Sequence, residues 1–513
     1  MRIKSIGLCI AGLGTVPFIN GKDHRPNIIY IMSDDHTSQA ISAYGGILSN
    51  VLSTPNLDRI ANEGVRLNNC FVTNSISTPS RAAIITGQYS HKNGVYSLDE
   101  PLDINHPNVA KELQKAGYTT GILGKWHLVT EPQGFDYYNI LPGHGRYNDP
   151  ILIEKGMWGD DPKKEAGPDK GKMYKGHETD VLTDEALRFM DNSKDKGKPF
   201  FLMCHYKAPH RTWIPADRFK DLFKDIKIPE PETLLDTYKN KGKYTELLRL
   251  RMEDLKKMDV KVDIPKGMTR DELRHWAYQY YLKEYLRCIA GIDENIGRIL
   301  DYLDENELTG NTIIIYTGDQ GFFLGEHGWF DKRLMYEECL RMPFLMRYPK
   351  EIKPGTVNDD IILNIDFAPL FLDYAKQKTP SYMQGKSFRD NLKGKTTSKW
   401  RKSMYYRYWM NADYDHNVIA NYGIRTDRYK LIFYYGEPLG RRGARKSPVG
   451  YKPEWELYDL DNDPLEMNNV YNDPSNKDLI RRLKTELLKL KQQYGDEDSL
   501  YPEMKEVVNR YFW

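Results

Sequence analysis

Short apolar runs of strand length recur along this chain, and a helix-like pattern follows most of them. The four clearest runs are residues 26–32, 119–123, 199–204 and 312–316. Helical patterns occupy residues 55–64, 108–116 and 278–306. Parallel strands need a long crossover, usually a helix, so this alternation favours an α/β fold with a large, mostly parallel mixed sheet flanked by helices.

Each of the four apolar runs ends abruptly at polar side chains. These polar ends are Asp34-Asp35-His36, Lys125-Trp126-His127, His205, and Asp319-Gln320. In open α/β sheets, ligands bind beyond the carboxyl ends of the strands. The sequence therefore predicts one active site at this edge of the sheet.

The pattern changes in the last quarter of the chain. Short strands are predicted at residues 405–409, 422–425, 430–435 and 456–460, and a helix at residues 478–494. A chain of 513 residues is too long for one ordinary core. We expect a catalytic domain over residues 22–392 and a C-terminal subdomain over residues 393–513, with a small antiparallel sheet and a packed helix. Residues 142–176 are expected to form loops, and residues 217–266 are charged and helical in pattern.

The N-terminus is typical of an export signal. Arg2 and Lys4 precede an apolar stretch over residues 6–19 that is too short to span a bilayer. We predict a signal peptide over residues 1–21 and export across the inner membrane to the periplasm; the alternative is a buried N-terminal strand. No other run is long and apolar enough to predict a membrane span.

The cysteines do not resemble a zinc site or a disulfide framework. Cys9 falls within the predicted signal, in a poor lipobox. The other four contain no Cys-x-x-Cys pair, and they are Cys70, Cys204, Cys288 and Cys339. Four buried thiols, or at most one or two bridges, are expected.

The charge balance excludes one class of function. The 74 Lys and Arg residues and 72 Asp and Glu residues leave a net charge of +2. A nucleic-acid-binding protein carries a strong basic excess, which is absent here. A local basic pocket for an anionic ligand remains compatible with this balance.

One eleven-residue segment, Ser77-Thr78-Pro79-Ser80-Arg81-Ala82-Ala83-Ile84-Ile85-Thr86-Gly87, carries the most specific signal. It is the pattern of a capped helix with Pro79 in the first turn, and a helix N-terminus favours a nearby anion. It also resembles the type I sulfatase signature at every fixed position, from Ser77 through Pro79 and Arg81 to Gly87. The resemblance implies an alkaline-phosphatase-like fold and a sulfuric ester hydrolase.

In that family, the residue at position 77 is oxidised to formylglycine by a maturase. The hydrated aldehyde attacks sulfur and later releases sulfate. Ser77 rather than Cys resembles the bacterial subgroup that an anaerobic radical enzyme matures.

The paired acids suggest a metal site. Adjacent carboxylates at Asp34 and Asp35 repel unless a hard cation holds them, although a solvated acidic turn is the alternative. By resemblance, Ca²⁺ is bound by Asp34, Asp35, Asp319, Gln320 and the modified Ser77. Gln320 departs from the Asn or His usual in the family.

The resemblance also implies roles for basic side chains. Arg81, Lys125 and Lys332 hold the sulfate, and His127 accepts a proton as sulfate leaves. His210 is the candidate general acid for the leaving alcohol, with His205 as the competing choice.

The substrate prediction rests on the C-terminal part of the chain, which resembles glucosamine-6-sulfatase-type members. The candidate sugar contacts are His327, Arg407, Trp409, Asp413 and His416. Trp409 either stacks on a pyranose or fills a small core. We predict 6-O-sulfated N-acetylglucosamine from glycosaminoglycan or mucin glycans as substrate. The alternatives are another sugar sulfate, a phosphonate or phosphodiester, and non-catalytic binding of sulfated glycans if Ser77 stays unmodified.

Overall fold

The computed structural model describes residues 24–513. The predicted signal peptide and Cys9 lie outside the described residues. Cys70, Cys204, Cys288 and Cys339 are buried and form no disulfide, which confirms the expectation of buried thiols. No helix among the described residues has the length and apolar character needed to cross a bilayer.

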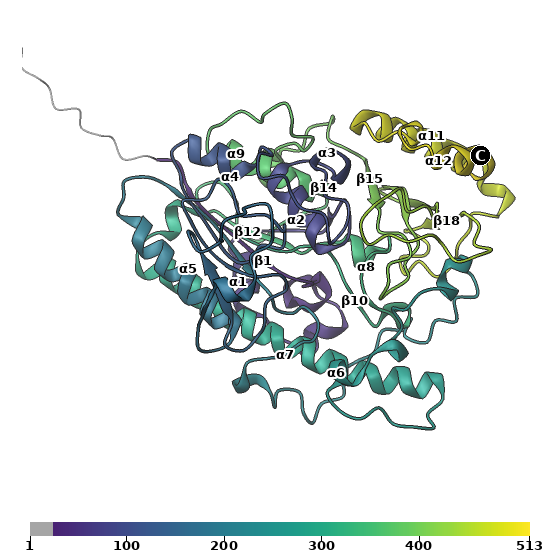
Figure 1. Cartoon of the computed structure of the whole chain (residues 1–513), viewed down its shortest axis with the longest axis horizontal. Coiled ribbons are helices and arrows are strands. Elements are labelled where there is room, and N and C mark those ends of the chain that lie inside the picture. The colour runs from purple at the N-terminus through teal and green to yellow at the C-terminus, as the bar shows by residue number, and fades with distance from the viewer. Residues whose placement is uncertain (1–23) are drawn as a thin grey trace, which may run out of the picture.

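A ten-stranded sheet forms the centre of the larger lobe (Figure 1). β1 (Asn27–Ser33) lies between β8 (Phe200–Tyr206) and β9 (Thr312–Gly318) and is parallel to both. Beyond β8 follow β4 (Thr119–Lys125), β5 (Tyr137–Leu141), β6 (Ile151–Glu154) and β7 (Lys172–Met173). Beyond β9 follow β12 (Phe344–Arg347), β2 (Val65–Leu67) and β13 (Thr356–Asn358).

The sheet is covered on both faces, and β1 shows why. Its residues alternate between two cores: Ile28 and Tyr30 point into one, and Ile29 and Ile31 into the other. The helices on the first face are α2 (Ser77–Thr86), α4 (Val109–Lys115) and α9 (Phe367–Tyr374). Those on the second are α1 (Pro55–Asn62), α5 (Glu178–Lys194) and α7 (Arg270–Glu305) (Figure 1). The predicted α/β architecture is confirmed.

The smaller lobe is the predicted antiparallel sheet. Its strands pair in chain order: β15 (Ser403–Tyr408), β16 (Asn421–Thr426), β17 (Tyr429–Tyr434) and β18 (Glu454–Asp459). α11 (Lys477–Tyr494) packs Leu483 and Leu487 against this sheet, and α12 (Met504–Tyr511) follows it. The apolar core is continuous between the two lobes. The division at residue 392 stays a prediction.

Three segments differ from the sequence expectations. Residues 217–266 contain only short helical turns such as α6 (Lys257–Val260), because Pro229, Pro231 and Pro265 interrupt the helical pattern. α7 begins eight residues before the predicted start, at a capping box formed by Thr269 and Glu272. Within residues 142–176, the strands β6 and β7 extend the sheet.

Candidate active site

The ends of β1 and β9 bring three carboxylates together. Asp34 and Asp35 follow β1, Asp319 and Gln320 follow β9, and the two strands are neighbours. All four side chains are buried. The backbone N–H of Asp35 donates to Asp319 Oδ1 over 3.0 Å. Parallel strand ends thus gather these residues, as the sequence predicts.

Ser77 enters the same cluster from the first turn of α2. Its hydroxyl is buried and donates to Asp34 Oδ1 over 2.9 Å. One turn later, Arg81 Nη2 lies 3.0 Å from Asp319 Oδ2, and Arg81 Nη1 donates to the Lys125 carbonyl over 2.5 Å. Gly87 ends the helix in the left-handed region, with a φ of 67°. The helix N-terminus and the guanidinium therefore both favour an anion at Ser77.

Two buried lysines pair with the carboxylates. Lys125 Nζ contacts Asp34 Oδ2, and Lys332 Nζ contacts Asp35 Oδ1. Burial lowers the pKa of Lys125 to about 8, although Asp34 opposes that shift. Burial opposes ionisation of Asp34 as well, but Lys125 and other cations outweigh it and hold its pKa well below the ordinary value.

The donor set fits a hard divalent cation. Burial, reinforced by repulsion from Asp34 and Asp319 and offset in part by Lys332, raises the pKa of Asp35 to about 7. Gln320 Oε1 is buried and has no hydrogen-bond partner among residues 24–513. Carboxylate oxygens and an unpartnered amide oxygen are the ligands that hard cations prefer. Asp34, Asp35 and Asp319 can therefore hold such an ion. Gln320 Nε2 donates to Asp35 Oδ1 and Asp319 Oδ1 over 2.5 and 2.7 Å, so its amide must turn by half a rotation to offer Oε1 as a further ligand.

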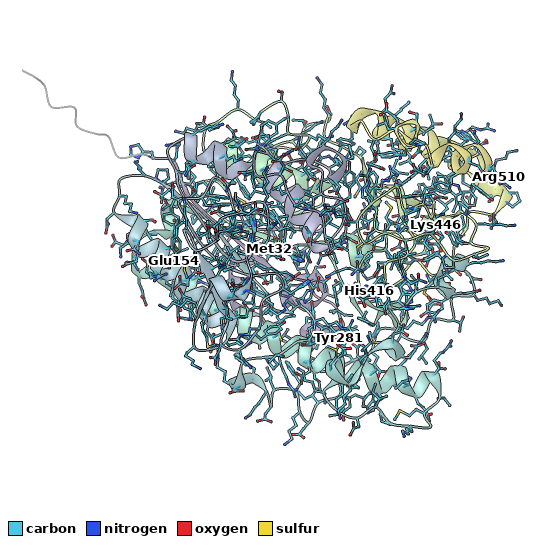
Figure 2. All side chains as sticks on the ribbon, viewed as in Figure 1. Met32, Glu154, Tyr281, His416, Lys446 and Arg510 are labelled. Atoms are coloured by element: carbon cyan, nitrogen blue, oxygen red, sulfur yellow. The ribbon has the colours of Figure 1, made fainter. Side chains whose placement is uncertain are left out.

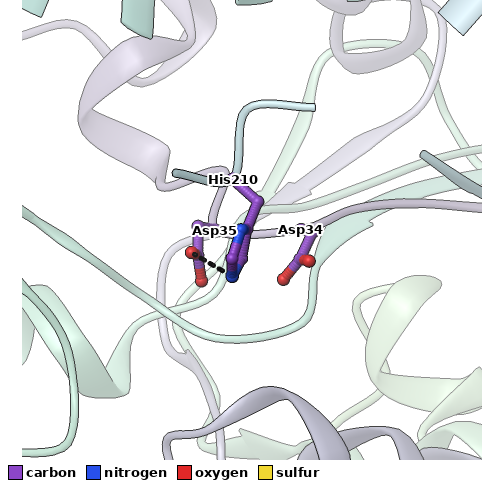
Figure 3. Close-up of side chains that lie close together, drawn as sticks. All are labelled: Asp34, Asp35 and His210. Atoms are coloured by element: carbon purple, nitrogen blue, oxygen red, sulfur yellow. Dashed lines mark ion pairs between the residues drawn. The ribbon is translucent and has the colours of Figure 1, made fainter. Parts of the chain in front are cut away.

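Three imidazoles lie beside this cluster where it meets solvent, which we call the opening: His144 is exposed and the His210 side chain is 17% exposed. The ring centroids of His127 and His144 are 4.4 Å apart, and those of His144 and His210 are 5.1 Å apart. His210 Nε2 lies 3.9 Å from Asp35 Oδ2, and Figure 3 shows it beside Asp34 and Asp35. The side chains of Asp34, Asp35 and His210 are close enough together to hold a metal ion. Burial and the charge of Lys125 keep the pKa of His127 and of His210 well below the ordinary value, so both rings are neutral at pH 7.

Sequence reasoning missed His144. It lies in the loop after β5, and its Nδ1 is 3.3 Å from Lys125 Nζ. The charge of Lys125 lowers the pKa of His144 below its ordinary value, although the residue is exposed to solvent. The other site residues were found because polar side chains follow parallel strands. His144 also follows such a strand, β5, which pairs in parallel with β4.

The structure distinguishes the two candidates for the acid. His205 is buried against the carbonyl of Lys125, with Nδ1 3.2 Å from that oxygen. His210 lies at the opening, where its side chain is 17% exposed. The geometry favours His210 as the group that meets a substrate.

Lys332 is held between two residues with unusual backbones. Asp331 and Arg333 have φ values of 73° and 92°, which ordinary L-residues rarely adopt. Asp331 Oδ2 is 3.4 Å from His416 Nε2, and His416 Nδ1 is 2.9 Å from Asp413 Oδ1. The smaller lobe therefore reaches the site through His416 and Asp413. The sequence motif that contains Lys332 includes Asp331 and Arg333, but sequence reasoning assigned neither of them a role.

The other three predicted sugar contacts do not reach the opening. His327 is fully buried, with Nδ1 3.1 Å from Asp236 Oδ2. Arg407 donates to both carboxylate oxygens of Asp496 over 3.1 Å, and the Trp409 ring lies 3.7 Å from its guanidinium carbon. Trp409 is 1% exposed and packs edge-on against Tyr96. All three side chains lie in the protein interior.

Family comparisons account for most of the chain. Residues 26–377 match the family described as sulfatase, and residues 325–493 match the C-terminal region of N-sulphoglucosamine sulphohydrolase. An N-acetylglucosamine-6-O-sulfatase of Bacteroides thetaiotaomicron is 42% identical and aligns with 94% of this chain and 89% of its own. An arylsulfatase of Clostridium perfringens is 26% identical over 91% of this chain and 94% of its own.

Solved structures share the fold. A protein solved in complex with its substrate, D-glucosamine-2-N,6-O-disulfate, has a TM-score of 0.84 and 41% identity, covering 92% of this chain and 99% of that one. A phosphonate monoester hydrolase from Silicibacter pomeroyi has a TM-score of 0.71 and 21% identity, covering 92% of this chain and 96% of that one. The second likeness concerns the fold alone.

Proposed function

The chain belongs to the sulfatase family and is a sulfuric ester hydrolase, and on that premise we propose that it removes the 6-O-sulfate of a glucosamine residue. Two observations support this substrate. A relative that is 42% identical is an N-acetylglucosamine-6-O-sulfatase. A structure with 41% identity was solved with glucosamine-2-N,6-O-disulfate as its substrate.

We further propose that Ser77 is oxidised to formylglycine and that Ca²⁺ binds beside it. When hydrated, formylglycine supplies the nucleophile for sulfur and a route for sulfate release. Calcium supplies a Lewis acid for the oxygens of the sulfate. Ser77 Oγ is 2.9 Å from Asp34 Oδ1, in the cluster of carboxylates that suits a hard cation. A formylglycine-generating maturase is then a required partner.

The cations of the site stabilise the charge of the sulfuryl group. Arg81, Lys125 and Lys332 are buried, so water screens their charges little. Their pairing with Asp319, Asp34 and Asp35 fixes them in place before substrate arrives. Fixed charges of this kind stabilise a transition state without reorganisation during the reaction.

The imidazoles handle the protons. His127 is neutral, and its Nδ1 lies 3.3 Å from Thr78 Oγ1, so its Nε2 can accept a proton as sulfate leaves. His210 Nδ1 lies 2.6 Å from the Arg211 carbonyl, which leaves Nε2 directed toward the site. The negative charge of a bound sulfate ester raises the pKa of this imidazole, so His210 can protonate the departing alcohol.

The predicted place of action is the periplasm. The basic and apolar start of the sequence supports export.

One observation carries the proposal: a serine at a helix N-terminus donates to one of three buried carboxylates, with two lysines and an arginine around them. The test incubates the exported, matured protein with N-acetylglucosamine 6-sulfate, its 3-sulfate isomer and a phenyl phosphonate. We expect release of sulfate from the 6-sulfate alone. Preferred cleavage of the phosphonate, or of the 3-sulfate, would refute the proposed substrate.

Two controls address the modified residue and the metal. Peptide mass across Ser77 should be lighter by one pair of hydrogen atoms, and Ser77→Ala should be inactive. EDTA should abolish turnover, and Ca²⁺ should restore it better than Mg²⁺, because several protein oxygens replace water around calcium. A peptide of unmodified mass with full activity would exclude formylglycine.

A further inference from the structure

A cavity of about 530 Å³ has in its wall Arg211 and Phe330, which are close in the chain to His210 and Lys332. Its wall includes Arg211, Arg249, Lys256 and Arg445, which we call the basic cavity residues. The remaining charged residues of the wall are two carboxylates, Asp254 and Asp415. Four cations and two anions leave an excess of positive charge, which attracts anions.

The cavity adjoins the groups that meet the sulfate. Arg211 directly follows His210, and its guanidinium lies 5.3 Å from the centre of the Phe330 ring, also in the wall. Phe330 precedes Asp331 and Lys332 in the chain. Figure 2 labels His416, the neighbour of Asp415, and His416 Nε2 lies 3.4 Å from Asp331 Oδ2, beside Lys332.

Three of the four cations of the cavity form no ion pair with the described residues. Among the described residues, no carboxylate forms an ion pair with Arg249, Lys256 or Arg445; Arg211 alone pairs, with Asp259. Arg445 donates to the carbonyls of Ala412 and Asp413 over 2.8 and 3.0 Å. Neutral backbone groups therefore hold the Arg445 guanidinium in place, and its positive charge stays available to an anion.

Backbone contacts also hold the cavity in shape. Arg249 Nη1 donates to the carbonyl of Tyr414 over 3.2 Å, and the Arg249 N–H donates to the carbonyl of His416 over 2.8 Å. The loop that carries His416 is thus tied to the segment that carries Arg249. A binding site that is ordered in advance loses less entropy when a ligand binds.

We propose that the basic cavity binds a second anionic group of the substrate, distinct from the sulfate that is cleaved. The inference rests on the proposed function, because it assigns the cavity to the same glycan. Arginine forks suit sulfate and carboxylate oxygens. Two sources supply this chemistry: an N-sulfate on the same glucosamine, and the carboxylate of a neighbouring uronic acid.

The experiment compares the wild type with the double variant Arg249→Gln, Arg445→Gln. For each, kcat/KM is measured on N-acetylglucosamine 6-sulfate and on glucosamine-2-N,6-O-disulfate. A second pair of substrates is a 6-sulfated disaccharide with a uronate neighbour and its analogue with a neutral neighbour. We expect the doubly charged member of one pair to lose its advantage about tenfold in the variant.

The pair that responds identifies the source of the anion. The conservative variant Arg249→Lys, Arg445→Lys keeps the charge and should retain most of the advantage. Arg510→Gln, which removes an exposed guanidinium at the far edge of the molecule in Figure 2, should leave both ratios unchanged. An advantage that persists in both pairs after the Gln substitutions would overturn the inference.

A binding experiment separates this inference from the proposed function. Glucosamine-2-N,6-O-disulfate and N-acetylglucosamine 6-sulfate are titrated into the Ser77→Ala protein and into the same protein carrying the two Gln substitutions. If the wild type cleaves neither sugar, the proposed function fails. With the uronate and neutral disaccharides titrated in the same way, the cavity is still judged by whether the doubly charged member of either pair loses about tenfold in affinity relative to its partner. Equal losses or none in both pairs would refute it.

Discussion

At the residue scale, the site is a balance of charges removed from water. Asp34, Asp35 and Asp319 are buried together with Arg81, Lys125 and Lys332. Burying a charge is costly unless an opposite charge and hydrogen bonds compensate. The ion pairs between these side chains offset the cost of burying their charges, and they also hold the cations where an anion must bind.

The first prediction concerns these cations. Arg81→Ala and Lys125→Ala should each lower kcat/KM by roughly 10²- to 10³-fold, because fixed charges that meet the transition state are lost. Sulfate release from N-acetylglucosamine 6-sulfate is the measurement. Arg146→Ala, which removes an exposed arginine, is the control. Turnover that survives in both site variants would contradict the assigned roles.

The second prediction concerns Glu338, an acid away from the carboxylate cluster whose side chain is 12% exposed. Burial, with repulsion from Glu326 and Glu466, raises the pKa of Glu338 from 4.5 to about 8. Between these two values the folded protein holds more protons than the unfolded chain, so its stability falls as pH rises. Glu338→Gln cannot ionise and should gain about 1–3 kcal/mol over the wild type at pH 8.

Urea unfolding of both proteins at pH 5 and pH 8 measures this effect. The gain should be small at pH 5, because the wild-type Glu338 is still largely protonated there. A gain of equal size at both values of pH would show that packing, and not titration, is responsible.

At the scale of elements, the site is made where parallel strands end and one helix begins. β1 and β9 supply the carboxylates, β4 ends at Lys125, and α2 starts at Ser77. The hydrogen bonds of the sheet fix these ends relative to one another. Precise placement therefore comes from rigid elements and not from the loops alone.

The third prediction concerns the junction of β15 with the segment after α11. Arg407 pairs with Asp496, and both side chains are buried. Arg407→Ala should lower the free energy of unfolding by about 3–5 kcal/mol, because it leaves a buried carboxylate without its partner. KM for the sulfated sugar should stay near the wild-type value.

Denaturant unfolding and kinetics on the same preparations test this prediction. Arg428→Ala removes an exposed partner of Asp459 and should change the stability little, because water screens that pair. A large rise in KM with unchanged stability would show that Arg407 contacts the sugar after all.

The sequence predicted the elements that carry the chemistry and missed others for physical reasons. Strands with continuous apolar runs, such as β1 and β9, are recognisable because both faces are buried. β5 mixes tyrosine, asparagine and apolar residues, so neither it nor His144 beyond it was found. Arg407 in β15 and Trp409 just after it show another limit. The sequence pattern of this segment does not reveal that the two side chains contact each other, or that Arg407 pairs with Asp496 inside the protein.

At the scale of the whole molecule, the two lobes share one apolar core. Tyr89 of the larger lobe packs against Tyr405 of the smaller, with ring centroids 5.7 Å apart. His416 connects the smaller lobe to Asp331, beside Lys332. The smaller lobe therefore borders the site at Asp331.

The fourth prediction follows from this shared core. The chain should unfold in a single calorimetric transition, and a chain truncated after residue 392 should not fold, because its apolar surface is left uncovered. Circular dichroism and proteolysis of the truncated protein are the measurements. A folded, cooperative fragment would show that the larger lobe is an independent domain.

The central claim is that this active site cleaves a 6-O-sulfate ester. The most direct measurement follows matured protein and N-acetylglucosamine 6-sulfate together by NMR and quantifies free sulfate. The account predicts that desulfated sugar and inorganic sulfate appear in equal amounts and that Ser77→Ala produces neither. An intact substrate after incubation with protein that carries formylglycine and calcium would contradict the account.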